Sequence, residues 1–250
     1  MKIFKSMSEW IKFRKTLSGT VGFVPTMGAL HDGHASLMKR CREECDVAVA
    51  SVFVNPVQFN DPKDLEKYPR APESDAKTLE SNGADYVIFP EYNQIYPDGY
   101  RYRLTENELS KTLCGASRPG HFDGVLTVVM KLFNIVKPDR AYFGEKDYQQ
   151  FLLIKGMAEA FFTGVEIVPC PTIRESDGLA MSSRNALLEP SLRPVAPEFH
   201  EALSSGLPAV EIKTVLTKKG FVIDYIEEHD GRIFGAVFLG KVRLIDNVKR

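Results

Sequence analysis

The stretch VGFVPTMGALHDGH, residues 21–34, decides the fold. Its first half belongs to an apolar run, Thr20–Pro25, that is typical of a buried strand, and a helical pattern follows over Ala35–Cys45. Between them, Gly28 and Gly33 allow the backbone to approach a ligand closely. A strand that leads through glycines into a helix offers free N–H groups and a positive dipole end, an arrangement that binds phosphate.

Two histidines, His31 and His34, stand at the predicted helix start. Imidazole rings add hydrogen-bond donors whose charge can be tuned near neutral pH. In α/β folds, ligands bind outside the carboxyl ends of the strands, and this segment lies at such an end. The simpler interpretation is a capped turn with two exposed histidines, but the strand–glycine–helix context favours a ligand site.

Short apolar runs and helical segments continue to alternate to about residue 175. Four more strands are predicted, at Asp46–Val54, Asp85–Phe89, Arg140–Phe143 and Val165–Val168. Three more helices are predicted, at Pro72–Asn82, Val125–Val136 and Tyr148–Phe162. Alternation at this spacing indicates βαβ units. We therefore expect residues 1–175 to form an α/β domain, a Rossmann-like, doubly wound parallel sheet with helices on both faces.

The pattern changes in the last third of the chain, where Pro190, Pro194 and Pro197 interrupt it. Two short helices are predicted there, at Glu198–Ser205 and Pro208–Lys218. Three strands are predicted after them, at Phe221–Glu227, Ile233–Leu239 and Lys241–Ile245, with a turn at Asp230-Gly231. We expect residues 176–250 to form a smaller α+β domain.

The composition is that of an ordinary globular protein, with 44% hydrophobic and 26% charged residues among 250. The chain has 32 Lys and Arg against 33 Asp and Glu, so no general attraction to nucleic acid is expected. The longest apolar stretch, Val47–Val54, is far shorter than the roughly 18 residues of a membrane span. Residues 1–15 lack the apolar centre of a signal peptide. We expect a soluble, cytoplasmic protein with no membrane partner.

The four cysteines are Cys41, Cys45, Cys114 and Cys170. Cys41 and Cys45 share one face of a predicted helix, but no second Cys or His pair follows at the spacing of a zinc site. We therefore expect buried free thiols in a reducing compartment, and the sequence predicts no metal-binding side chain.

Two downstream segments carry side chains suited to a nucleotide. FGEKDYQQ, residues 143–150, follows a predicted strand, and its Lys146 and Asp147 suit a phosphate and a ribose. For that segment alone, a solvated turn capped by Asp147 is the favoured alternative. DGLAMSSRN, residues 177–185, places two serines beside Arg184, whose planar guanidinium matches phosphate oxygens. By itself this string is weak, because Ser-Ser-Arg is common in loops.

Amide and other polar side chains follow or precede apolar elements at VNPVQF, residues 54–59, and at RPGHFDG, residues 118–124. They suggest a small polar organic substrate, with loop packing an equal alternative for each segment. The sequence contains no P-loop motif, no Gly-x-Gly-x-x-Gly after the first strand and no Gly-x-Ser-x-Gly. Because no nucleophile is evident, we expect chemistry that depends on positioning and charge stabilisation.

The motifs His31-Asp32-Gly33-His34 and Met181-Ser182-Ser183-Arg184 together resemble the paired signatures of the nucleotidyltransferases related to class I aminoacyl-tRNA synthetases. More narrowly, the chain resembles the pantoate–β-alanine ligase family in the strings PTMGALHDGH, FVNPVQF, YPR, RPGHFDGVLTVV, KLFNIVKPDRAYFGEKDYQQ and DGLAMSSRN, in this order. The similarity covers about residues 20–190 and resumes at RLIDN, residues 243–247. Its specificity comes from the set of motifs.

The resemblance implies an ATP-dependent reaction in two steps. ATP and pantoate give an enzyme-bound pantoyl adenylate and pyrophosphate, and the amine of β-alanine then displaces AMP to give pantothenate. Mg²⁺ with the polyphosphate, a homodimer and a C-terminal domain that moves as a lid are also implied. The segment between Asn185 and Arg243 is shorter than is usual in the family and rich in proline, which leaves the extent of the lid open.

The resemblance also assigns side chains to this reaction. His34 and His31 would donate to the reacting phosphate, Lys146 would neutralise its charge, and Arg184 would close over the terminal phosphates with two serines. The implied ATP-binding residues are Met27, Gly28, Ala29, Leu30, His31, Asp32, Gly33, His34, Gly144, Glu145, Lys146, Asp147, Ile173, Met181, Ser182, Ser183 and Arg184. The implied residues for pantoate and β-alanine are Gln58 and Gln150. Asp75 is at most an outer contact of the Mg²⁺ ion.

Two alternative functions remain open at this point. A nucleotidyltransferase that passes AMP or CMP to a phosphate shares the His-x-Gly-His helix start, but it leaves Gln58 and Gln150 without a task. A nucleotide-binding protein without catalytic activity is the second alternative, suggested by the shortened C-terminal part. It would bind ATP but release no pyrophosphate when pantoate is added.

Overall fold

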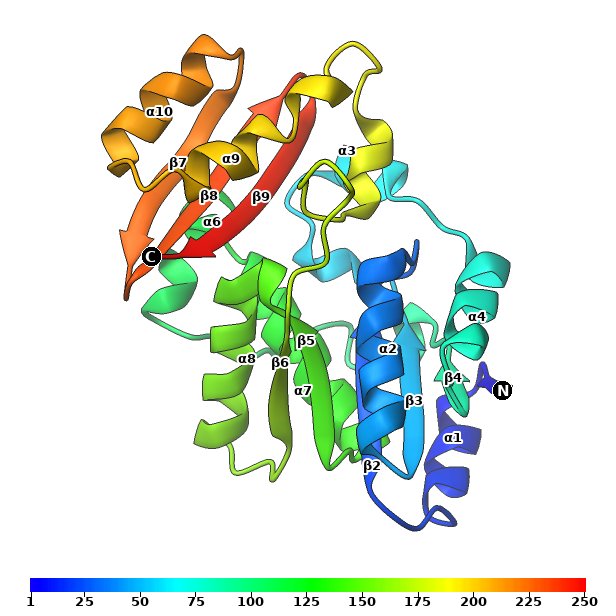
Figure 1. The fold of residues 1–250 in the computed structure, drawn as a ribbon. Helices are drawn as coiled ribbons and strands as arrows, with labels where there is room; N and C mark the ends of the chain where they lie inside the picture. The colour runs from blue at the N-terminus through cyan, green and yellow to red at the C-terminus, as the bar shows by residue number, and fades with distance from the viewer.

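The computed structural model describes all residues, Met1–Arg250, and shows a large parallel sheet with a smaller antiparallel sheet above it in the view of Figure 1. The large sheet has the strand order β1-β4-β3-β2-β5-β6, with every neighbouring pair parallel. Its strands are β1 (Lys2–Phe4), β2 (Val21–Thr26), β3 (Val47–Val52), β4 (Tyr86–Ile88), β5 (Arg140–Gly144) and β6 (Glu166–Cys170). The strand order reverses between β2 and β5, the switch point at which such sheets bind ligands. The predicted doubly wound α/β fold is confirmed.

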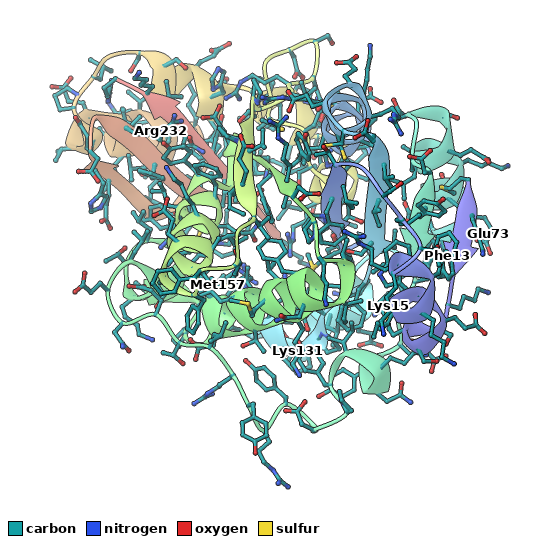
Figure 2. The ribbon with its side chains drawn as sticks, turned by 90° about the horizontal axis from the view of Figure 1, so that it is seen from below. Phe13, Lys15, Glu73, Lys131, Met157 and Arg232 are labelled. Carbon is teal, nitrogen blue, oxygen red and sulfur yellow. The ribbon has the colours of Figure 1, made fainter.

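Helices cover both faces of this sheet. One face carries α1 (Met7–Arg14), α7 (His121–Val136) and α8 (Tyr148–Ala160), and the other carries α2 (Asp32–Glu44) and α4 (Pro72–Ser81). Alternate residues of β2 point to opposite faces, so that Phe23 packs in the cluster with α7 and Val24 in the cluster with α2. Figure 2 shows α7, with Lys131, and α8, with Met157, side by side on their face. Burial on both faces explains why the strands are almost wholly apolar.

Close packing of α2 on β2 depends on Gly22. A Cβ atom at this position would lie 2.8 Å from Cys45 Sγ and closer still to Cys41 Sγ, so only glycine leaves room. The two cysteines therefore face the sheet together, at the end of α2. All four cysteines of the chain are buried and free.

The smaller sheet contains β7 (Val222–His229), β8 (Arg232–Leu239) and β9 (Val242–Lys249), all antiparallel. The hairpin between β7 and β8 turns at Asp230 and Gly231, both with positive φ, as the Asp-Gly pair predicts. Two helices, α9 (Glu198–Ser204) and α10 (Ala209–Lys218), pack on this sheet. Fifteen buried residues between Leu179 and Leu244 form a cluster of their own.

Several elements differ from the sequence prediction. The chain begins with β1 and α1, two elements that the sequence pattern does not predict. The side chain of Ser6 caps α1 by accepting a hydrogen bond from the Glu9 N–H. α2 begins at Asp32 rather than Ala35, and α7 at His121 rather than Val125, because each helix includes a polar first turn. β9 extends to Lys249, beyond the predicted end at Ile245.

Short helices complete the connections. They are α3 (Pro62–Lys67), α5 (Tyr92–Ile95) and α6 (Cys114–Ser117), and the 3₁₀ turns η1 (Pro56–Gln58), η2 (Leu109–Lys111), η3 (Glu145–Asp147), η4 (Ser183–Leu187) and η5 (Arg193–Val195). Two of the three prolines that interrupt the C-terminal pattern lie at helix starts: Pro194 lies in the first turn of η5 and Pro197 is the N-cap of α9. None of the helices is both long enough and apolar enough to cross a bilayer.

Gly124, in the first turns of α7, provides a test of this packing. A Cβ atom on Gly124 would lie 2.8 Å from Gln58 Cα and 2.8 Å from Val57 O, so Gly124→Ala should push η1 away from α7. We expect a loss of about 1–3 kcal/mol in the free energy of unfolding, measured by urea denaturation.

The matched control is Gly156→Ala, in the exposed part of α8, where an added Cβ would meet nothing within 4 Å. That substitution should leave the protein as stable or stabilise it by up to about 1 kcal/mol, since alanine is the better helix former. Equal stability changes in the two variants would contradict the close contact between α7 and η1.

Candidate active site

The loops after β2, β3, β5 and β6 surround a cavity of about 240 Å³ at the carboxyl ends of these strands. Most of the predicted site residues line it: Met27, His31, Gly33, His34, Gln58, Gly144, Lys146, Asp147, Gln150, Ile173, Met181, Ser182, Ser183 and Arg184. Three stretches that are far apart in the chain therefore meet at one edge of the sheet. The predicted residues outside this lining are Gly28, Ala29, Leu30, Asp32 and Glu145.

The loop Gly28–Leu30 is held in place by Asp75 of α4. The Asp75 carboxylate is only 2% exposed and accepts hydrogen bonds from the N–H groups of Ala29, at 3.1 Å, and Leu30, at 2.8 Å. These bonds hold Ala29 at φ +51°, a left-handed conformation that a residue with a Cβ rarely adopts. Asp75 therefore fixes the conformation of the loop after β2, because its carboxylate oxygens bind backbone N–H groups of that loop.

The two histidines cap α2 with their own rings. His31 is the N-cap residue, and its Nδ1 accepts from the Gly33 N–H at 3.1 Å, while His34 Nδ1 accepts from the His31 N–H at 3.3 Å. A neutral imidazole whose Nδ1 accepts a hydrogen bond carries its proton on Nε2. The ring centroids lie 4.2 Å apart, and both rings line the cavity. The start of α2 thus offers two ring N–H donors together with its positive dipole end.

Burial keeps both rings uncharged at neutral pH. Burial, and then the neighbouring His31, lower the pKa of His34 to about 3. Burial and the Lys146 ammonium also lower the pKa of His31. The sequence suggested rings whose charge is tuned near neutral pH, but in the fold they are neutral donors. The positive charge that lines the cavity comes from Lys146 and Arg184.

Gln58 is oriented by a chain of hydrogen bonds. Tyr96 Oη donates to Asn55 Oδ1 at 2.9 Å, and Asn55 Nδ2 donates to Gln58 Oε1 at 3.0 Å. Gln58 Nε2 donates to the Met27 sulfur at 3.0 Å. The sequence pointed to residues 54–59, but it gave no sign of Tyr96, whose hydroxyl reaches Asn55 only in the folded chain.

Arg184 is bound within the protein in this structure. Its Nη2 lies 3.0 Å from Asp64 Oδ2 of α3, and its guanidinium lies over the Tyr68 ring, 5.8 Å from the centroid. Both partners in the ion pair are partly exposed, so the pair contributes little stability. Arg184 can therefore exchange Asp64 for a phosphate at small cost, because a phosphate accepts two hydrogen bonds from one guanidinium.

A second cavity, of about 830 Å³, adjoins the first and extends to the C-terminal sheet. The two cavities share part of their lining, namely Lys146, Asp147, Gln150, Ser182 and Arg184. Lys63, Arg118 and Arg243 also line the larger cavity, so the space beside the predicted phosphate site carries several cationic side chains.

Arg118 has no carboxylate partner in the folded chain. Its Nη2 donates to Gln58 O at 3.3 Å, and its Nη1 lies 3.1 Å from Nε2 of His121, whose Nδ1 lies 2.8 Å from Gln58 O. Burial, followed by the nearby Arg184 and Arg243, lowers the pKa of Arg118 to about 10, which leaves it charged at neutral pH. A half-buried charge without an acidic partner favours an anionic ligand. The sequence marked residues 118–124 as polar but did not single out Arg118.

The fold and the site define a Rossmann-like α/β protein with a cavity at the switch point of its sheet that is lined by hydrogen-bond donors and two cationic side chains. The family model for pantoate-beta-alanine ligase matches residues 1–249. The pantothenate synthetase of Bdellovibrio bacteriovorus is 55% identical over 248 residues, and that of Legionella pneumophila is 53% identical over 249 residues. Each of these alignments covers 99% of both chains, so the C-terminal part has the length found in these two relatives.

A solved structure extends the comparison. The pantoate-beta-alanine ligase from Francisella tularensis, complexed with beta-gamma ATP and beta-alanine, superimposes with a TM-score of 0.94 at 42% identity, covering 100% of this chain and 97% of that one. The pantothenate synthetase from Thermus thermophilus superimposes with a TM-score of 0.90 at 40% identity. The chain therefore belongs to the pantoate–β-alanine ligase family, a family of ligases.

The neutral histidines give the stability a defined pH dependence. His34 and His121 both have a pKa of about 3 in the fold, lowered mainly by burial from the ordinary 6.5. Between pH 6.5 and 3 the folded chain therefore binds fewer protons than the unfolded chain, and the free energy of unfolding must fall as the pH is lowered. Each histidine contributes a slope that approaches about 1.4 kcal/mol per pH unit.

Urea denaturation at several pH values between 7 and 5 measures this slope. His34→Gln and His121→Gln should each make the fall less steep than in the unchanged protein, because glutamine binds no proton. If both variants show the same pH dependence of the unfolding free energy as the unchanged protein, the fold does not hold these rings neutral.

Proposed function

We propose that the chain condenses pantoate with β-alanine in an ATP-dependent reaction that releases AMP and pyrophosphate through a pantoyl-adenylate intermediate. One observation carries the proposal: the donors of α2, the Lys146 turn and the Ser182–Arg184 loop surround the same small cavity that Gln58 and Gln150 line. A triphosphate and a small hydroxy acid would therefore lie in contact there. Membership of the ligase family supports this reaction over the transfer of a nucleotide to a phosphate.

In the first step, a pantoate carboxylate oxygen attacks the α-phosphorus, and the bond to the bridging oxygen of pyrophosphate breaks. Negative charge grows on the phosphate oxygens, so donors already aimed at them lower the barrier. The Nε2–H groups of His31 and His34 would supply such donors without moving, because their Nδ1 atoms are fixed by the backbone of α2. Lys146 would balance the charge of the leaving pyrophosphate.

The loop from Met181 to Arg184 would hold the terminal phosphates, with Ser182 and Ser183 donating from their hydroxyls. Arg184 would leave Asp64 for the phosphates. Gly28 to Leu30, Gly144 to Asp147 and Ile173 would hold adenosine, largely through the backbone. Gln58 and Gln150 would orient pantoate through its hydroxyls and carboxylate. Asn55 supports this arrangement by fixing the carboxamide of Gln58.

In the second step, the amine of β-alanine attacks the acyl carbon, and AMP leaves as the acyl–phosphate bond breaks. The nucleophile must reach the adenylate from a space beside the first cavity, and the larger cavity is that space. Arg118 would bind the β-alanine carboxylate, because it has no acidic partner and lies against the backbone of Gln58. We propose Arg118 as the residue that orients β-alanine.

Mg²⁺ would accompany the ATP polyphosphate. No three or more His, Cys, Asp and Glu side chains come together in a way that could hold a metal ion. The side chains therefore do not form a metal site of their own, and the steps above are assigned to protein groups only. Phosphate oxygens and water would provide the ligands of an ion that enters with ATP.

We further propose two domains, residues 1–175 and 176–250, in a cytoplasmic homodimer whose smaller domain closes over the nucleotide. The separate cluster of buried residues between Leu179 and Leu244 supports the division.

The reaction is tested by incubating the purified protein with ATP, Mg²⁺, pantoate and β-alanine, and by omitting each in turn. Pantothenate, AMP and pyrophosphate in equal amounts over many turnovers support the ligase, provided that both organic substrates are required. A product that retains the nucleotide supports a nucleotidyltransferase, and ATP binding without pyrophosphate release when pantoate is added supports a binding protein.

His34→Ala is expected to lower the rate of pyrophosphate release from ATP and pantoate by about 10²–10³-fold, the usual scale for one preorganised donor. The rate is measured in a single turnover without β-alanine, and far-UV circular dichroism shows whether the fold is retained. Near-normal turnover of a folded variant would remove His34 from the mechanism.

Arg118→Met is expected to raise the KM for β-alanine by about 10–100-fold, the range for losing a hydrogen-bonded charge pair, while pyrophosphate release from ATP and pantoate changes little. Arg101→Met, at an exposed position outside both cavities, is the matched control. It should change neither the KM for β-alanine nor the rate of pyrophosphate release. A defect of Arg118→Met confined to the first step would contradict a role in binding β-alanine.

A further inference from the structure

Strand β9 of the C-terminal sheet contacts the Lys146 turn through one buried side chain, Asn247. This residue is only 5% exposed. Its Nδ2 donates to two backbone carbonyl oxygens, those of Glu145 and Lys146, both at 2.9 Å. These carbonyls belong to η3, the 3₁₀ turn that places the Lys146 side chain in both cavities. The contact joins residues about a hundred positions apart in the chain.

Arg232 of β8 fixes the direction of this carboxamide. The Asn247 Oδ1 accepts a hydrogen bond from Arg232 Nη1, so a flipped amide would place its oxygen against two carbonyl oxygens and its NH₂ against a guanidinium. The same guanidinium lies 3.8 Å from the ring centroid of Tyr148 and 3.9 Å from a carboxylate oxygen of Glu145. Figure 2 labels Arg232 on the C-terminal sheet. The contacts of Arg232 with Glu145 and Tyr148 therefore hold the chain before and after Lys146.

The preceding residue, Asp246, holds the second nucleotide segment. Its buried carboxylate accepts from both terminal nitrogens of Arg174, at 2.7 and 3.1 Å, and lies 2.9 Å from His200 Nδ1. Arg174 also donates to Gly178 O at 3.1 Å and stands at the base of the loop that ends in Met181–Arg184. Asp246 and Asn247, two adjacent residues of one strand, thus contact the two segments that are predicted to bind the triphosphate, the Met181–Arg184 loop through Arg174 and η3 directly.

We propose that Asn247 is a positioning residue for Lys146. Through the Asp246-Asn247 pair, the position of the C-terminal sheet then determines whether the two segments of the triphosphate-binding site are correctly placed. Although Asn247 lines the larger cavity, its amide nitrogen and oxygen are both bound within the protein. It acts by fixing the backbone of η3, so that the ammonium of Lys146 is in place when the terminal phosphates arrive. The inference rests on the proposed function only in naming those phosphates as the partner of Lys146.

Three variants separate this role from a general loss of structure. Asn247→Asp keeps the shape and the contact with Arg232 but turns an oxygen towards the two carbonyls, so it should displace η3 most. Asn247→Ala removes both hydrogen bonds, and Arg232→Gln frees the amide to turn. We expect ATP-dependent pyrophosphate release in a single turnover to fall at least tenfold in Asn247→Asp, and less in the other two.

The decisive measurement is a pair of double-mutant cycles with Asn247→Ala. In a Lys146→Ala background, Asn247→Ala should change the rate less than twofold, because the group that it positions is already absent. In a Gln58→Ala background it should cause its full loss, because Gln58 stands on a different segment. The same fold-loss in both backgrounds would overturn the proposal, and so would an unimpaired Asn247→Asp. If Asn247→Ala does not fold, the same cycles are run with Arg232→Gln.

A binding measurement keeps the inference separate from the proposed reaction. The affinity for a non-hydrolysable ATP analogue, measured by calorimetry without pantoate, should fall in Asn247→Asp and should follow the same two cycles. If the unchanged protein binds the analogue but forms no pantothenate, the proposed reaction fails while the role of Asn247 is still decided by these affinities. Equal affinities in Asn247→Asp and the unchanged protein would contradict the positioning role.

Discussion

The capping of α2 by its own two histidines is the interaction on which the site depends. Backbone N–H groups at a helix start need acceptors, and here imidazole Nδ1 atoms supply them. The capping fixes the tautomer of each ring, and it leaves the Nε2–H groups for a ligand. Because burial keeps the rings neutral, they donate hydrogen bonds without adding charge at the point where the reacting phosphate is expected. The helix dipole and the ring donors then act in the same direction.

Around this helix start, buried polar side chains that have no direct role in the proposed reaction hold the loops of the site in place. Asp75 holds the loop after β2, Asn55 turns Gln58, and Asp246 and Asn247 hold the two nucleotide segments. Each of these groups satisfies backbone or side-chain partners that would otherwise be unpaired in a buried place. Preorganisation of this kind favours a reaction that depends on placement, since the groups held in this way do not have to move when charge develops.

The neutral hydrogen-bond donors lie at the start of α2, whereas the positively charged side chains lie around the two cavities. Lys146, Arg118, Arg184 and Arg243 stand around two adjoining cavities. A carboxylate oxygen lies 3.0 Å from Arg184, 2.7 Å from Arg243 and 3.7 Å from Lys146, whereas Arg118 has no such partner. The Arg184 pair with Asp64 is partly exposed and therefore exchangeable. The cationic wall can thus receive several anionic groups, in line with a reaction whose substrates and products carry phosphates and carboxylates.

The sequence by itself determined the class of fold and the three segments that meet at the cavity, because both follow from local periodicity and from motifs that are continuous in the chain. It did not determine the start of α2, where imidazoles replace the usual capping side chains, or the tasks of Asp75, Tyr96, Arg118 and Asn247. Those tasks depend on which distant backbone groups each side chain meets, and on burial that sets the charge of the histidines. Such neighbours exist only once the sheet order and the position of the C-terminal strands are fixed in three dimensions.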